Sequence, residues 1–115
     1  MIRGGVYAVN LGDAKRGHEQ RGKRYGIVMS PPDSPLTVAT IIPTSTSAQP
    51  GLVHVQVNFD ERPTLALVEQ TRVIDKDFIG EMVGMVPFIE MLEIELALAQ
   101  YLGLTPTLTG RNQDG

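Results

Sequence analysis

The residues best suited to chemistry in this 115-residue chain lie in one polar segment, residues 17–24. Six of these eight residues are polar or charged, and they include His18, Glu19 and Arg24. Cleavage of a phosphodiester by its own 2′-hydroxyl needs a base near the nucleophile, a donor to the leaving oxygen and cations on the phosphate. The imidazole, carboxylate and guanidinium of this segment could supply these groups. A solvated charged loop would have the same composition.

A second polar cluster, Thr-Ser-Thr-Ser at residues 44–47, stands just past a predicted strand. Hydroxyls and exposed backbone N–H groups in such a loop could complete a cradle for an anion. Together with residues 17–24, this cluster is the candidate site.

Little else in the sequence indicates catalysis. His54 alternates with Gln56 and Asn58 and is therefore expected on the solvent-facing side of a strand. No set of His, Asp and Glu has the spacing of metal ligands, and cysteine is absent, so we expect no metal. Neither a phosphate-binding P-loop nor a G-x-S-x-G elbow is present, and no cofactor is expected.

The charge distribution indicates a local anion site rather than a broad nucleic-acid surface. The formal net charge is −3, yet residues 1–24 hold six Lys or Arg against two acids, and residues 25–115 hold four against eleven. Polyanion-binding proteins are usually basic overall. No apolar run exceeds four residues, which is too short to span a membrane, and a cytoplasmic protein is expected.

Short runs rich in β-branched and apolar residues, with turns about every ten residues, predict five or six antiparallel strands in a small barrel. Strict alternation of apolar and polar residues at 53–59 is the clearest strand signal. The predicted strands cover residues 6–11, 24–30, 36–43, 53–59, 64–73 and 80–86, with a turn of helix near 75–77.

The pattern then changes to that of a helix over residues 88–102, where eleven of fifteen residues are apolar. Pro87 suits the first helical position and Gly103 suits the C-cap. Either this wide apolar face lies across an open barrel mouth, or part of it meets another chain. Residues 1–104 are expected to form one domain, and residues 105–115 a flexible tail.

The chain resembles the MazF/PemK family of endoribonuclease toxins from bacterial toxin–antitoxin pairs. The resemblance runs from Arg3 to Leu104. It rests on ordered blocks at appropriate spacing: RGGVY with VNL at residues 3–11, GHEQRGKR with IV at 17–28, TV through IPTS at 37–45, EQTRVID at 69–75, and the helix end at 97–104.

This resemblance implies a mainly β, SH3-like barrel of the MazF/Kid/CcdB type with a C-terminal α-helix, working as a homodimer. It implies metal-independent, sequence-specific cleavage of single-stranded RNA, chiefly mRNA, that leaves 2′,3′-cyclic phosphate and 5′-hydroxyl ends. It also implies a cognate antitoxin of the MazE/PemI kind as a partner.

The family's functional residues carry over by position. The catalytic set would be Arg24, Thr44 and Glu19. RNA contacts are expected from six residues: His18, Gln20, Lys23, Ser45, Glu69 and Gln70. Because a guanidinium is effectively always protonated, we expect Arg24 to stabilise charge on the phosphate, with Glu19 or His18 accepting the 2′-hydroxyl proton.

The chain also departs from the family pattern at three positions. Gly5 replaces the usual acid of the opening motif, and Leu67 stands where some relatives use an Arg. Tyr25 replaces the Pro that normally follows the essential Arg. An aromatic ring there could stack a base or fill a gap.

Two functions from other classes are alternatives to RNA cleavage. CcdB-type gyrase inhibitors share the barrel but end in Trp-Gly-Ile, whereas this chain has no Trp and ends in Asn-Gln-Asp-Gly. A catalytically inactive binding module is the second alternative. The presence of Arg24, Thr44 and Glu19 argues against it.

Overall fold

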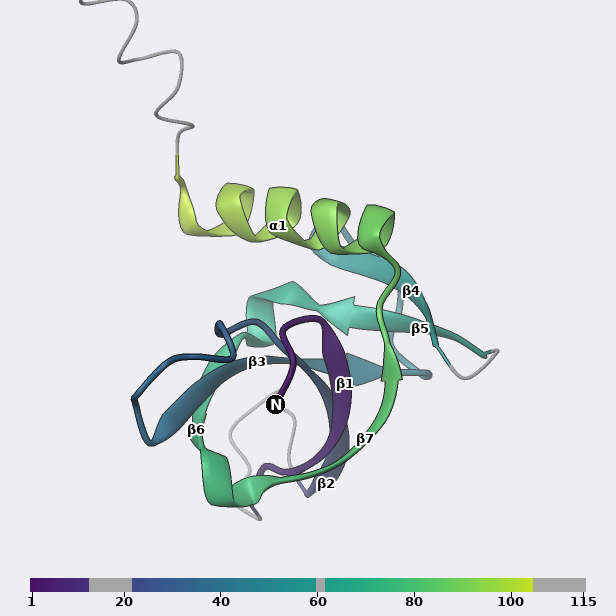
Figure 1. Cartoon of the computed structure of the whole chain (residues 1–115). Helices are drawn as coiled ribbons and strands as arrows, with labels where there is room; N and C mark the ends of the chain where they lie inside the picture. Colours follow the sequence, from purple (N-terminus) through teal and green to yellow (C-terminus); the bar gives the residue numbers. More distant parts are fainter. Residues whose placement is uncertain (13–21, 60–61, 105–115) are drawn as a thin grey trace, which may run out of the picture.

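Seven strands, two short 3₁₀ turns and one helix follow one another in residues 1–12, 22–59 and 62–104, the parts of the chain that the computed structural model describes (Figure 1). The expected mainly β fold with a C-terminal helix is confirmed. The tail predicted at 105–115 lies outside the described residues. The elements are β1 (Gly5–Asn10), β2 (Lys23–Val28), β3 (Val38–Ser45), β4 (His54–Phe59), β5 (Arg62–Leu67), η1 (Val68–Gln70), β6 (Arg72–Asp75), η2 (Lys76–Phe78), β7 (Ile79–Met85) and α1 (Phe88–Leu102).

Strand β3 organises the sheet because it pairs with three other strands. The sheet order is β4-β5-β3-β2-β1-β7, all paired antiparallel, and β6 also pairs with β3. One edge of β3 pairs with β2. Its other edge pairs with β6 along its first half and with β5 at its end. β3 therefore belongs to both halves of the fold.

The prediction of a single strand over residues 64–73 is wrong, because the chain breaks there into β5, η1 and β6. Ala66 lies opposite Thr44, and Arg72 lies opposite Ile41. Six steps along one chain therefore face three steps along β3, and the surplus residues cannot stay in the ladder. They form η1, in which Val68 is buried and its backbone N–H donates to the Val53 carbonyl oxygen at 3.2 Å.

The apolar side chains form two clusters on either side of the curved sheet. The larger one lies between the sheet and α1 and contains Val6, Ile27, Ile42, Val57, Ala66, Val68, Met91, Ile94 and Ala97, among others. The smaller one fills the barrel and contains Tyr7, Val9, Leu11, Val28, Ile41 and Ile74. Neighbouring residues such as Ile41 and Ile42 point into different clusters because side chains alternate along a strand.

The predicted helix range 88–102 is confirmed, and polar contacts fasten the helix to the barrel. Pro87 is the N-cap and not the first helical residue, since its ψ of 150° is extended. Gly103 adopts the left-handed conformation, with φ 70°, and caps the carboxyl end as expected. The Glu90 carboxylate accepts the backbone N–H and the side-chain amide of Asn58 at 2.8 and 2.7 Å.

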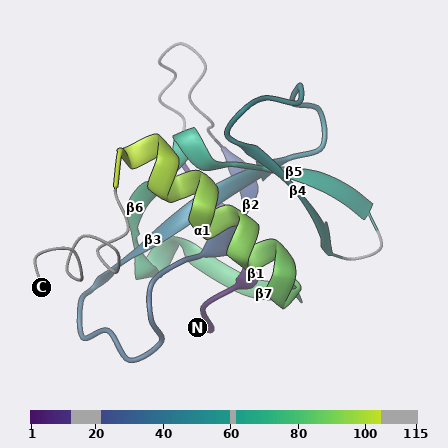
Figure 2. The same cartoon turned by 90° about the horizontal axis from the view of Figure 1, so that it is seen from above.

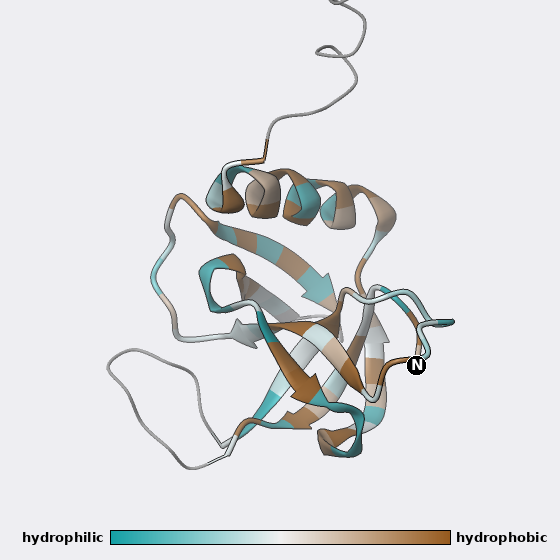
Figure 3. Ribbon diagram, turned by 90° about the vertical axis from the view of Figure 1, so that its left-hand side faces the viewer, coloured by the Kyte–Doolittle hydropathy of each residue, from teal (hydrophilic) through white to brown (hydrophobic). Residues whose placement is uncertain are grey.

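Helix α1 lies across the top of the fold and packs beside β4 (Figures 1 and 2). It buries Met91, Ile94 and Ala97 against the sheet. Apolar residues also recur on its outer side (Figure 3), and Phe88, Ile89, Leu92 and Leu96 are 40–74% exposed. The helix thus covers the barrel and still leaves apolar surface open to solvent. In the part of the chain that the structure describes, no helix is long and apolar enough to cross a membrane.

Candidate functional site

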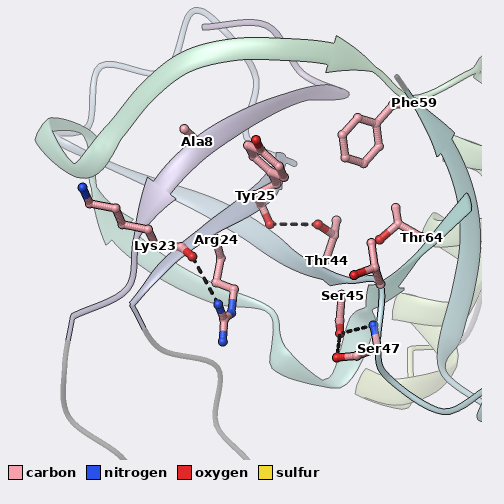
Figure 4. A pocket seen from close by; sticks show the side chains of 10 residues that line it. Ala8, Lys23, Arg24, Tyr25, Thr44, Ser45, Ser47, Phe59 and Thr64 are labelled. Atoms are coloured by element: carbon pink, nitrogen blue, oxygen red, sulfur yellow. Dashed lines mark hydrogen bonds between the residues drawn. The ribbon is translucent and has the colours of Figure 1, made fainter. Parts of the chain in front are cut away.

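One cavity of about 660 Å³ opens where the ends of β2 and β3 meet β4 and β5 (Figure 4). Two of the residues that line it carry a positive charge, Lys23 and Arg24, and none of the described lining residues is acidic. The complete lining is Ala8, Lys23, Arg24, Tyr25, Thr44, Ser45, Thr46, Ser47, Phe59 and Thr64. Among the described residues, an acidic chain therefore presents a cavity whose charged lining side chains are cationic, which suits an anionic ligand.

Arg24 and Lys23 stand at the start of β2. Backbone hydrogen bonds join the residues before and after positions 13–21, from Leu11 N–H to Gly22 O at 2.8 Å and from Gly22 N–H to Gly12 O at 2.6 Å. Gly12 and Gly22 have φ values of 81° and 72°, a conformation that glycine adopts without strain. The Arg24 side chain is exposed, and its Nη1 donates to the Lys23 carbonyl oxygen at 3.3 Å. The cations are thus fixed beside the cavity by the backbone of β2.

Thr44 is a buried residue within β3 and does not lie in a loop beyond it. The expectation that residues 44 and 45 follow the strand is wrong, because their backbones pair with Ala66 and Leu65 of β5. The Thr44 side chain is 5% exposed, and its hydroxyl donates to the Tyr25 carbonyl oxygen at 3.1 Å. This hydroxyl therefore joins the two strands that carry the cavity's polar wall.

Ser45 shapes the turn that follows β3. Its Oγ accepts the backbone N–H groups of Ser47 and Ala48 at 3.2 and 3.0 Å and lies 3.4 Å from Ser47 Oγ. Because a hydroxyl has two lone pairs and one hydrogen, Ser45 can accept both bonds and still donate its proton. The predicted hydroxyl cluster is therefore part of the cavity wall, with Thr46 and Ser47 beside it.

Glu69 and Gln70, predicted to contact RNA, lie in η1 and are not among the residues that line the cavity. Glu69 instead contacts His54, whose Nε2 lies 2.9 Å from Glu69 Oε2 and whose Nδ1 lies 2.6 Å from Gln49 O. His54 lies in register with the exposed residues Gln56 and Asn58, as predicted, but these contacts leave its side chain only 18% exposed. The alternating pattern cannot show that η1 folds over this end of β4.

The ion pair with Glu69 alters the protonation of His54. The hydrogen bond to the Glu69 carboxylate raises the pKa of His54 above 6.5, with a further contribution from the Gln49 carbonyl oxygen. Burial acts in the opposite direction and lowers the pKa. The imidazolium form donates from both ring nitrogens and satisfies both oxygen acceptors at once.

Three predicted residues, His18, Glu19 and Gln20, lie outside the described residues. The structure brings together Lys23, Arg24, Thr44 and Ser45 and adds two aromatic residues, Tyr25 and Phe59, that were not predicted as a pair. In the sequence, only the residue type of Tyr25 indicated an aromatic group at this site, because Phe59 lies on a strand that is distant along the chain. Within the described ranges, no three His, Asp or Glu side chains gather as a metal site would require.

The fold and the cavity define a small antiparallel barrel with a C-terminal helix and a cationic, hydroxyl-lined site at the ends of β2 and β3. Residues 2–102 match the family model described as PemK-like, MazF-like toxin of type II toxin–antitoxin system. The chain therefore belongs to the PemK/MazF family of toxins.

Individual relatives agree with this assignment. The Mycobacterium tuberculosis protein named "Putative toxin Rv3098A/RVBD_3098A" is 47% identical over 105 residues, which cover 90% of this chain and 99% of that protein. The crystal structure of MazF from Deinococcus radiodurans has a TM-score of 0.78 at 21% identity, covering 90% of this chain and 97% of that one. An endoribonuclease in complex with its cognate antitoxin, from a mycobacterial species, has a TM-score of 0.75 at 21% identity, covering 92% and 98%. At these identities, the two structures establish a shared fold.

Proposed function

We propose that this toxin is an endoribonuclease that cleaves single-stranded RNA, with mRNA as the expected substrate. The observation that carries the proposal is the cavity, in which Lys23 and Arg24 stand beside the Thr44 and Ser45 hydroxyls without a neighbouring acid among the described lining residues. A phosphodiester is anionic and gains charge at its non-bridging oxygens during cleavage, so cations and hydroxyl donors stabilise the transition state. Structural relatives named as endoribonucleases support the proposal.

In the proposed reaction the 2′-oxygen bonds to phosphorus, the bond from phosphorus to the 5′-oxygen breaks, and the 2′-hydroxyl proton passes to a base. A guanidinium is effectively always protonated, so Arg24 is proposed to stabilise the charge on the phosphate and to donate a hydrogen bond to the leaving oxygen, which takes its proton from water. Glu19 or His18 is the proposed base. The products are a 2′,3′-cyclic phosphate and a 5′-hydroxyl, and no metal takes part.

Thr44 is proposed to stabilise the protein through its observed hydrogen bond and to donate a hydrogen bond to the phosphate of bound RNA. Its proton is directed at the Tyr25 carbonyl oxygen. To donate to a non-bridging oxygen, the hydroxyl must exchange that acceptor for the phosphate. Thr44→Ser preserves the hydroxyl, whereas Thr44→Val removes it and should also cost about 1 kcal/mol of stability.

The test is to incubate the purified protein with single-stranded RNA in EDTA and to identify the fragment ends by mass spectrometry. Cyclic phosphate ends are expected, and Arg24→Ala should lower the cleavage rate by about 10²–10³-fold. Lys76→Ala is the matched control, because it removes a positive charge far from the cavity. Lys76 lies next to the opposite end of β3, where its backbone N–H donates to the Thr37 carbonyl oxygen. A folded Arg24→Ala protein that cleaves at the wild-type rate would refute the site. Intact RNA with the wild-type protein would favour a non-enzymatic toxin of the CcdB kind or a binding module.

We also propose that the cognate antitoxin blocks this cavity. A segment that folds on binding and carries acidic residues would be attracted to Lys23 and Arg24, and both binding and inhibition should weaken as salt rises. One structural neighbour is an endoribonuclease in complex with its cognate antitoxin. Titrating the antitoxin's C-terminal peptide into a complex with uncleavable RNA tests the idea. Simultaneous binding with unchanged affinities would contradict it. Because the proposed substrate is mRNA and the proposed partner is an antitoxin, we propose that the toxin acts in the cytoplasm.

The exposed apolar side of α1 is the proposed homodimer contact. Phe88, Ile89 and Leu96 are each more than 60% exposed on a helix that is already packed on its own barrel. Stable homodimer interfaces are rich in apolar residues, and such a surface is costly to leave in water.

A further inference from the structure

The cavity has an aromatic wall as well as a cationic one. Tyr25 of β2 and Phe59 of β4 both line it, with ring centroids 6.0 Å apart and planes at 86°. Figure 4 shows the two rings on one side of Thr44 and the Arg24 guanidinium on the other. The site therefore places apolar rings close to the groups proposed to hold a phosphate.

The Tyr25 ring is not a space-filling core residue. Tyr25 is 48% exposed, so a large part of its surface is open at the cavity. Its neighbour across the sheet is Ala8, whose small side chain also lines the cavity. Among the described residues, the Tyr25 hydroxyl has no hydrogen-bond partner. About half of the surface of Tyr25 is thus open to solvent.

Phe59 holds the other side of the pair in place. It is partly buried and packs against the larger apolar cluster. A Cβ added at Gly84 of β7 would stand 3.2 Å from the Phe59 Cβ and 3.3 Å from its Cδ2, so glycine provides the space that Phe59 occupies. In an edge-to-face pair, one ring covers at most one face of the other. Aromatic surface therefore remains open for a third ring.

The backbone of Tyr25 is also tied to the polar wall, because its carbonyl oxygen accepts the Thr44 hydroxyl. The backbone of the residue whose ring could hold a base is consequently joined by one hydrogen bond to the hydroxyl proposed to meet the phosphate. Arg24 is the preceding residue of the same strand. A nucleotide bound here has its anionic and its aromatic parts matched by adjacent groups.

We propose that Tyr25, supported by Phe59, is the base-stacking residue that holds the nucleotide beside the scissile phosphate. This proposal rests on the proposed function and names the residue that positions a base of its substrate. Bases of single-stranded RNA are free to stack on aromatic side chains, whereas those of a duplex are already stacked on each other. Tyr25 therefore contributes both to affinity and to the preference for single strands.

The test compares binding of two uncleavable strands of equal length and charge, a 2′-fluoro RNA and the same backbone carrying abasic sites. Stacking is worth about 1–3 kcal/mol per base, so wild-type protein should bind the base-bearing strand about 5–150-fold more tightly. Tyr25→Phe should keep this ratio, and Tyr25→Leu should reduce it toward one. Tyr101→Leu is the control, because Tyr101 is 50% exposed on α1 and outside the cavity.

The outcomes separate this proposal from the proposed function. Arg24→Ala should weaken binding of both strands alike, since it removes a charge contact and leaves the rings. If the wild-type protein cleaved no RNA, the proposed nuclease activity would be refuted. The ratio of affinities for the base-bearing and abasic strands would still report on stacking. An unchanged ratio in folded Tyr25→Leu, or wild-type protein that binds both strands equally, overturns the role of Tyr25.

Discussion

Replacing Glu69 with Gln should destabilise the protein more below about pH 6.5 than above it, because the change removes the carboxylate that favours protonated His54. In the folded protein both ring nitrogens face oxygen acceptors, Glu69 Oε2 at 2.9 Å and Gln49 O at 2.6 Å. A neutral imidazole can donate to only one of them. The contact therefore raises the pKa of His54, and protonation and folding reinforce one another.

The direction of the pH dependence follows from this raised pKa. Between the ordinary value of 6.5 and the higher folded value, the native state binds more protons than the unfolded state. The stabilisation from His54 is thus fully present below about pH 6.5 and is lost as the pH rises through the folded pKa. Wild-type stability should fall over this window, and the Glu69→Gln protein should show a shallower fall.

The size of the effect follows from the burial of the pair. The His54 and Glu69 side chains are 18% and 30% exposed, so solvent screens the contact only in part. A hydrogen bond between charged groups contributes about 1.5–3 kcal/mol, and the amide of Gln restores about 1 kcal/mol of it. We therefore expect Glu69→Gln to cost about 0.5–2 kcal/mol near pH 6 and less than half of that near pH 9.

Urea unfolding followed by circular dichroism, at one fixed protein concentration and a series of pH values, measures this difference. The control is Glu81→Gln, which changes an exposed carboxylate on β7 and should show no such trend. A loss of stability that is constant between about pH 5.5 and pH 9, or that grows as the pH rises, would refute the reasoning.

Three further outcomes are expected. Leu96→Glu, at a side chain 69% exposed on α1, should leave the fold intact and convert the proposed homodimer to a monomer in light scattering at micromolar concentration; an unchanged mass would rule out this surface as the dimer contact. Glu90→Gln should lower the free energy of unfolding by about 1 kcal/mol because the amide keeps only one oxygen acceptor for the two N–H donors of Asn58, whereas exposed Glu93→Gln should not. Gly103→Ala should cost about 1 kcal/mol in thermal unfolding, since its φ of 70° is strained for alanine; equal melting temperatures would contradict this.

The amino-acid sequence determined the elements whose signals are local. Helix α1 was predicted at its observed bounds because its periodicity and the glycine after it act within a few residues of the chain. The alternation in β4 likewise indicated a strand, since period two alone separates its buried and exposed faces. The family motifs predicted that Arg24 and Thr44 belong to the candidate site, because the order and spacing of those motifs can be seen in the sequence alone.

The tertiary structure decided everything that depends on which strands meet. The division of residues 64–73 into β5, η1 and β6 arises from mismatched lengths along the edge of β3, which no pattern within that segment reveals. His54 acquires its ion pair only because η1 folds over the end of β4. Tyr25 and Phe59 form one wall of the cavity because β2 and β4 converge around the end of β3. Contacts between distant segments depend on sheet register, and register is fixed by the packing of the whole barrel.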